Sequence, residues 1–225
     1  MTKNIIKLKT SDSIEIAGDF YPAEGSQIHN LPSGILLHMM PATKDSWKDF
    51  AKKLNNEGFQ CLAIDLRGHG QSEDGPDGFI NFSDQQHRES IKDVEAAAEF
   101  LISNGVSPEK IFLVGASIGA NLALQYQSMY SEIKASVLLS PGLSYKGIDT
   151  EVLIKNLYEK QSVFLTAGGE NDEYSTETVQ KLYKIAKVDN KELKVFQKSG
   201  HGTNIFIEEP SSMDQVINWL KNIYD

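Results

Sequence analysis

From residue 34 onward, the sequence alternates short, unbroken apolar runs with amphipathic segments of helix length. Strands whose two faces are both covered by helices have such runs, because every side chain along them is buried. The pattern therefore predicts a parallel sheet covered on both faces. The predicted strands are residues 34–38, 60–65, 110–115, 135–139, 162–166 and 193–196.

Two more strands are predicted near the start of the chain. Residues 4–10 have a strand-like pattern, a polar turn follows at residues 11–13, and apolar residues alternate again over 14–17. This hairpin makes the expected fold an eight-stranded, mostly parallel sheet of the α/β class, with helices on both faces. The predicted helices lie near residues 45–57, 83–104, 118–130, 149–159, 175–187 and 211–223.

Length and composition limit the possible classes of protein. A chain of 225 residues can bury one core, and it contains no repeat or low-complexity linker, so we expect a single domain over residues 1–225. A net charge of -9 without a basic cluster argues against nucleic acid as a partner. No apolar run approaches the roughly 20 residues of a membrane span, and no signal-peptide pattern opens the sequence. We therefore expect a cytoplasmic protein without membrane insertion.

A candidate nucleophile lies between the predicted strand 110–115 and the predicted helix 118–130. Residues 115–119 read Gly-Ala-Ser-Ile-Gly, a GxSxG pattern. In a strand-to-helix elbow the serine has a strained backbone, and side chains two residues away on either side would collide, which explains both glycines. The pattern predicts Ser117 as a nucleophile beside the positive end of a helix. The alternative is a Gly-rich turn with a capping serine.

A serine hydroxyl needs a base to accept its proton, and five histidines are available. His201 lies in a Gly-flanked loop after the last predicted strand, at the sheet edge where the elbow is expected, and it is the predicted base. His38 ends a strand and is expected to support the structure. His69 lies in a tight turn, whereas His29 and His87 look like surface residues.

The base in turn needs a carboxylate to orient it. The predicted strand 162–166 leads into a turn with three acidic residues, and we predict Asp172 as the orienting acid and Glu170 and Glu173 as solvated neighbours. The alternative is that all three acids only belong to a surface turn. The order Ser117, Asp172, His201 is the order of α/β-hydrolases and differs from that of two protease families.

Together these residues resemble the α/β-hydrolase superfamily along nearly the whole chain, in particular small esterases, lysophospholipase-like enzymes and dienelactone-hydrolase-like proteins. Residues 38–41 (His-Met-Met-Pro) look like the family's His-Gly-X segment, and residues 65–72 look like its D-x-R-G-x-G-x-S loop. The resemblance implies an α/β-hydrolase fold and an oxyanion hole formed by the backbone N–H groups of Met40 and Ile118. The family usually has glycine at the position of Met39, and dienelactone hydrolases have cysteine at that of Ser117.

Only residues 141–161 separate the sixth predicted strand from the seventh, where this superfamily usually inserts a lid. We therefore expect a minimal cap and an open site. Met39, Leu143 and Tyr145 are the predicted substrate-binding residues of an apolar pocket, although some of them could pack in the core instead.

The expected function is that of a serine hydrolase, a carboxylesterase that cleaves esters of small to medium acyl groups through an acyl-enzyme. An amide or thioester hydrolase or an acyltransferase could use the same triad, and a non-catalytic binding protein could retain the fold. The sequence shows neither a nucleotide fingerprint nor a zinc-type histidine pair, so no cofactor and no metal are expected. The expected partner is a small ester, and the expected state is a monomer or homodimer.

Overall fold

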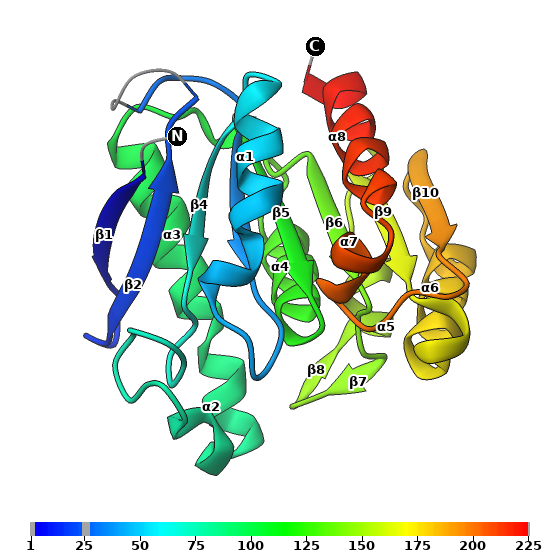
Figure 1. The fold of residues 1–225 in the computed structure, drawn as a ribbon, viewed down its shortest axis with the longest axis horizontal. Helices are drawn as coiled ribbons and strands as arrows, with labels where there is room; N and C mark the ends of the chain where they lie inside the picture. The colour runs from blue at the N-terminus through cyan, green and yellow to red at the C-terminus, as the bar shows by residue number, and fades with distance from the viewer. Residues whose placement is uncertain (1–2, 24–27, 225) are drawn as a thin grey trace.

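The computed structural model describes residues 3–23 and 28–224. Its main element is an eight-stranded sheet in the order β1-β2-β4-β3-β5-β6-β9-β10 (Figure 1). The first two strands pair antiparallel, β2 pairs antiparallel with β4, and the other neighbours are parallel. The strands are β1 (Asn4–Lys9), β2 (Glu15–Tyr21), β3 (Ser33–Leu37), β4 (Gln60–Ile64), β5 (Ile111–Ala116), β6 (Ala135–Leu139), β9 (Ser162–Ala167) and β10 (Asn190–Val195). The predicted sheet is confirmed.

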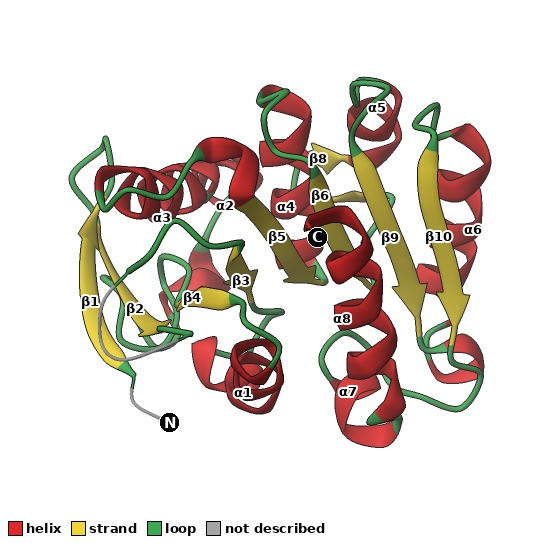
Figure 2. Ribbon diagram, turned by 90° about the horizontal axis from the view of Figure 1, so that it is seen from above, coloured by secondary structure: helices red, strands yellow, loops and turns green. Residues whose placement is uncertain are grey.

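Helices cover both faces of the sheet because side chains alternate between the faces along each strand. Ile35 and Leu37 belong to one apolar cluster, and Leu36 belongs to the other. Figure 2 shows α1, α7 and α8 on one side of the sheet and α3, α4 and α5 on the other. The helices are α1 (Lys48–Asn56), α2 (Asp84–Glu89), α3 (Ile91–Ser103), α4 (Ile118–Met129), α5 (Thr150–Lys155), α6 (Glu173–Ile185), α7 (Asn204–Glu208) and α8 (Ser211–Tyr224).

Two helical predictions need correction, and one helix was missed. The helix predicted over 83–104 is two helices that meet at Ser90, the first of which begins with a capping box formed by Ser83 and Gln86. The helix predicted over 149–159 ends at Lys155. The five-residue helix α7 was not predicted, because five residues carry too little periodicity to detect.

Between β6 and β9 the chain forms only a short hairpin and α5. The hairpin consists of β7 (Ser144–Tyr145) and β8 (Ile148–Asp149), and its two turn residues, Lys146 and Gly147, both have positive φ. A two-residue turn of this kind matches the twist of paired strands. The hairpin lies at the edge to which the arrows of the parallel strands point (Figure 1), so the cap over this edge is small.

None of the helices within the described residues is long and apolar enough to cross a membrane.

Candidate active site

Ser117 lies at the tight elbow between β5 and α4. Its φ of 52° and ψ of -119° are strained for a residue with a side chain, and the side chain makes no capping hydrogen bond to the helix. The elbow closes tightly on itself. A Cβ atom on Gly115 would lie 2.1 Å from the carbonyl oxygen of Gly119, and one on Gly119 would lie 2.2 Å from the carbonyl oxygen of Leu37. Both glycines are therefore required by the space available.

His201 and Asp172 come together from two different loops at the carboxyl end of the sheet. The Nδ1 atom of His201 lies 2.8 Å from Oδ1 of Asp172. Asp172 is buried at the start of α6, whereas the side chain of His201 is 40% exposed. Glu170 and Glu173 are both exposed, as solvated neighbours should be. The structure thus brings Asp172, and neither of its acidic neighbours, to the imidazole.

Hydrogen bonds keep Asp172 ionised. Burial is the largest influence and opposes ionisation, but hydrogen bonds with His201, Ser140 and Ser175 outweigh it and lower the pKa of the carboxyl group below its ordinary value. An ionised carboxylate only accepts hydrogen bonds. The Nδ1–H group of His201 therefore donates a hydrogen bond to Asp172, and Nε2 can act as an acceptor.

Ser117 and His201 line the same cavity, which has a volume of about 220 Å³. Tyr145 lines it as predicted from the sequence, and Tyr174 also does. Met39 and Leu143 are not among its lining residues and pack against the two apolar clusters instead. The cavity is lined by Ser117, Ser140, Gly142, Tyr145, Tyr174, Ser175 and His201, none of which is acidic or basic apart from the histidine.

The loop after β3 lies beside the elbow, as the close approach of Gly119 to the Leu37 carbonyl shows. Met40 is in this loop, and Ile118 is the first residue of α4. Within the described residues, neither of these two backbone N–H groups donates a hydrogen bond. Both N–H groups thus lack an acceptor among the described residues, and neither residue is among those that line the Ser117 cavity. Met39 lies next to the His201 loop, since a Cβ atom on Gly202 would be 2.6 Å from its sulfur atom.

His38 holds the Met39–Met40 loop in place. The N–H of Leu66 donates to Nε2 of His38 over 3.0 Å, so the ring proton resides on Nδ1, which donates to the Met39 carbonyl over 2.9 Å. Burial, with the neighbouring His69, lowers the pKa of His38 to about 4, which keeps the ring neutral. His38 therefore supports the structure, as expected from the sequence.

The prediction that His87 is a surface residue is wrong. Its side chain is buried against Phe82, and its Nε2 atom has no hydrogen-bond partner among the described residues. His87 lies in the last turn of α2, and the six residues of this helix carry too little periodicity to show which side chain faces inward. His29 is exposed.

The loop at residues 65–72 is a rigid structural element. The carboxylate of Asp65 accepts hydrogen bonds from the backbone N–H groups of Lys44 and Gln71, and from the Lys44 ammonium group over 2.7 Å. Arg67 forms ion pairs with Asp12 and Asp93. These contacts fix the loop through buried charge pairs and leave no group of it at the Ser117 cavity.

Sequence reasoning missed two serines that contact the Asp172–His201 pair. Ser140 follows β6 directly, has a φ of 52°, and accepts a hydrogen bond from the Gly202 amide. The Ser175 hydroxyl lies 3.4 Å from Nδ1 of His201. A polar residue directly after a parallel strand was the signal for Ser140, because such positions lie at the edge of the sheet that carries the site.

No group of three His, Cys, Asp or Glu side chains in the described part of the chain is arranged to hold a metal ion.

A family model for the alpha/beta hydrolase fold matches residues 35–162, which is more than half of the chain and includes the Ser117 elbow. Asp172 and His201 lie outside the matched residues. The chain is 28% identical over 153 residues to monoacylglycerol lipase abhd6-B of Xenopus laevis, which aligns 67% of this chain with 40% of that protein. It is 30% identical over 133 residues to a Haemophilus influenzae protein assigned as a 2-succinyl-6-hydroxy-2,4-cyclohexadiene-1-carboxylate synthase, covering 58% of this chain and 45% of that protein.

The chain thus matches less than half the length of these two curated relatives. Among solved structures, the Pyrococcus furiosus esterase Pf2001 has a TM-score of 0.78 at 22% identity and covers 100% of this chain and 92% of its own. A monoglyceride lipase from Saccharomyces cerevisiae has a TM-score of 0.76 at 14% identity, and the match covers 100% of this chain and 96% of the lipase chain. At these identities the likeness shows the fold. With the eight-stranded sheet, the elbow and the family match in agreement, this chain belongs to the alpha/beta hydrolase fold family.

Proposed function

We propose that this protein is a serine hydrolase that cleaves carboxylic esters of small to medium acyl groups through an acyl-enzyme. One observation carries the proposal: Ser117 and His201 line one cavity, and His201 contacts the buried Asp172 over 2.8 Å. This arrangement supports the assignment of Ser117 as nucleophile, His201 as base and Asp172 as orienting acid.

In the first half of the reaction, the Ser117 oxygen adds to the ester carbonyl while Nε2 of His201 takes the hydroxyl proton. The imidazolium that forms is stabilised by the Asp172 carboxylate at Nδ1. The amides of Met40 and Ile118 donate to the oxyanion of the tetrahedral intermediate. When the intermediate collapses, the C–O bond to the alcohol breaks and His201 returns the proton to the leaving alkoxide.

In the second half, water replaces the alcohol. His201 takes a proton from the attacking water while the water oxygen adds to the acyl carbonyl. When this intermediate collapses, the bond between the acyl carbon and the Ser117 oxygen breaks, His201 returns the proton to that oxygen, and the carboxylic acid is released. The same residues act in the same roles, so no additional group is needed for deacylation.

The cavity supports a neutral substrate of modest size. Its volume is about 220 Å³, and Tyr145 and Tyr174 line it without a charged side chain to pair with an ionic substrate. Two similar proteins, the Xenopus lipase and the Pyrococcus esterase, are named for ester hydrolysis, which agrees with an ester as substrate. The Haemophilus relative is named a synthase, so the fold alone does not determine the reaction.

Covalent labelling tests the proposal. A fluorophosphonate probe should label the wild-type protein, and Ser117→Ala should abolish the labelling, while Ser144→Ala, which removes an exposed serine of the hairpin, should leave it unchanged. His201→Ala should slow labelling strongly. The wild type should also hydrolyse p-nitrophenyl acetate or butyrate. Undiminished labelling of Ser117→Ala would refute the nucleophile, and labelling without hydrolysis of any ester would refute the substrate class.

A further inference from the structure

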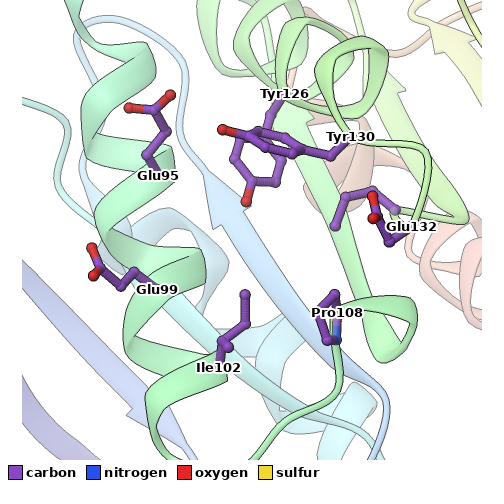
Figure 3. A pocket seen from close by; sticks show the side chains of 8 residues that line it. Glu95, Glu99, Ile102, Pro108, Tyr126, Tyr130 and Glu132 are labelled. Carbon is purple, nitrogen blue, oxygen red and sulfur yellow. The ribbon is translucent and has the colours of Figure 1, made fainter.

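A second cavity, larger than the one at Ser117, lies between α3 and the C-terminal half of α4 (Figure 3). Its volume is about 460 Å³, and it shares no lining residue with the Ser117 cavity. Tyr126 of its lining is nine residues after Ser117 on α4, which corresponds to about 14 Å along the helix axis. The second cavity is therefore a separate feature, to which the proposed ester hydrolysis assigns no role.

The charged side chains of this cavity are all acidic. Glu95 and Glu99 extend from α3 on one side, and Glu132 lies on the other side, after α4 (Figure 3). None of the described residues that line the cavity is basic. Like-charged carboxylates around one hollow repel one another, and a bound cation relieves this repulsion. The C-terminal end of α4 adds a partial negative charge nearby.

Two tyrosines supply the aromatic part of the lining. The rings of Tyr126 and Tyr130 lie 4.6 Å apart between their centroids. Tyr126 is 5% exposed, and its hydroxyl points into the cavity and makes no hydrogen bond with any described residue. The ring of Tyr126 is thus largely buried, while its hydroxyl faces the cavity. This hydroxyl offers a polar contact to a ligand in this cavity.

The pKa values of both tyrosines are raised mainly by burial, and the neighbouring carboxylates add to the effect. Burial raises the pKa of Tyr130, and the Glu95 carboxylate raises it further. The pKa of Tyr126 is raised by burial, and then by Tyr130, Glu95 and Glu132. The contribution of the carboxylates, which opposes a phenolate anion, favours a cation in the same place.

The geometry favours an organic cation over a metal ion. The carboxylates of this cavity do not form a group of three metal-ligating side chains, as far as the described residues go. Ile102, Pro108 and Ile133 provide apolar walls. Aromatic faces, apolar walls and surrounding carboxylates are the combination that holds substituted ammonium ions, since the charge is spread over a large, weakly hydrated group.

We propose that the cavity between α3 and α4 is a binding site for a small, unattached organic ammonium ion, held by the rings of Tyr126 and Tyr130 and by the charges of Glu95, Glu99 and Glu132. The site is independent of the Ser117 chemistry. The proposal predicts that, of two ligands of equal shape, the site binds the positively charged ligand more tightly than the neutral one.

Choline and 3,3-dimethylbutan-1-ol are the matched probes. They have the same shape, but choline has a positively charged quaternary nitrogen where the alcohol has a neutral quaternary carbon. In an NMR titration at constant ionic strength, choline should shift the amide signals of α3 and of residues 126–133. The alcohol should bind about tenfold more weakly or worse. Equal affinities, or choline-induced shifts confined to other regions, would overturn the proposal.

Variants of surface glutamates test the charges without disturbing the core. The triple variant Glu95→Gln, Glu99→Gln, Glu132→Gln should bind choline about tenfold more weakly. The control is Glu109→Gln, an exposed glutamate near Pro108 that does not line the cavity, and it should bind like the wild type. Wild-type affinity in the triple variant would refute the site. These experiments measure the affinity for choline and not ester hydrolysis. Their outcome therefore does not depend on whether Ser117 is a nucleophile, and the titration can be repeated in Ser117→Ala.

Discussion

The Ser140 hydroxyl accepts a hydrogen bond of 2.9 Å from the backbone N–H of Gly202, the residue after His201. The same hydroxyl hydrogen-bonds to Asp172 and helps to lower the pKa of that carboxyl group. One serine at the end of β6 thus connects the loops that carry the acid and the base. We interpret Ser140 as a positioning residue for the proposed triad.

Ser140→Gly should therefore lower kcat about tenfold and leave KM nearly unchanged, because the loss of one hydrogen bond to a charged group loosens the pair. Glycine tolerates the φ of 52°, so Ser140→Gly removes the hydroxyl and also relieves the backbone strain, whereas Ser140→Ala removes the hydroxyl and keeps the strain that serine already has. Steady-state kinetics with p-nitrophenyl acetate and thermal unfolding of both variants are the measurements. A wild-type kcat in Ser140→Gly would contradict the positioning role.

Asp172→Asn should lower kcat about 10³- to 10⁴-fold, because a neutral amide neither fixes the Nδ1–H tautomer of His201 nor stabilises its imidazolium. Glu170→Gln and Glu173→Gln are matched controls that remove an exposed carboxylate from the same turn, and we expect less than about a twofold change from each. Ester hydrolysis at neutral pH measures all three. A large loss in Glu170→Gln or Glu173→Gln instead would reassign the acid.

Tyr145→Ala should shift substrate preference towards longer acyl chains. Tyr145 lines the 220 Å³ cavity and is 38% exposed, so its removal widens the mouth without opening the core. Each additional buried methylene is worth up to about 0.8 kcal/mol, so we expect kcat/KM for p-nitrophenyl octanoate to rise several-fold relative to acetate. Tyr158→Ala, at an exposed tyrosine outside the cavity, should leave the ratio unchanged. An unchanged ratio in Tyr145→Ala would remove this residue from the acyl site.

His87 should make the protein less stable in acid. Burial lowers its pKa to about 4, whereas an unfolded histidine titrates near about 6.5. Between these values the unfolded chain binds a proton that the folded chain does not. The free energy of unfolding therefore falls as the pH falls from about 6.5 to 4, by at most about 3 kcal/mol for this residue, and the contribution is fully present above pH 6.5.

Urea unfolding at pH 5 and pH 7.5 measures this effect. His87→Leu should show a smaller difference in unfolding free energy between the two pH values than the wild type. His38, which is also buried with a lowered pKa, should still contribute in the same direction. His29→Gln changes an exposed histidine and should behave as the wild type does. An unaltered pH dependence in His87→Leu would contradict the burial of this ring.

The sheet was predictable because most of its strands are continuous apolar runs. Ala135–Leu139 matches the prediction to the residue. The last strand was predicted only over 193–196, although β10 begins at Asn190, because Lys191 and Glu192 lie on a partly exposed edge strand and interrupt the apolar run. The hairpin at residues 144–149 has two-residue strands, which no periodicity can detect.

The site was partly predictable for a related reason. Ser117 lies in the GxSxG pattern, which can be recognised in the sequence. Asp172 and His201 were predicted from the rule that functional residues lie at the carboxyl ends of parallel strands. The ammonium-binding cavity was not predictable, because it depends on which faces of α3 and α4 meet. Glu95 and Tyr126 are 31 residues apart in the sequence, and each alone reads as an ordinary helix residue.

The small cap has a kinetic consequence for an acyl group attached to Ser117. Only the β7–β8 hairpin and α5 stand between β6 and β9, and the imidazole of His201 is 40% exposed. We expect water to reach an acyl-enzyme in such a site readily, because the described residues form only this small cap between β6 and β9. Other acceptors would compete with that water, so for the proposed acyl-enzyme we expect hydrolysis to prevail over transfer.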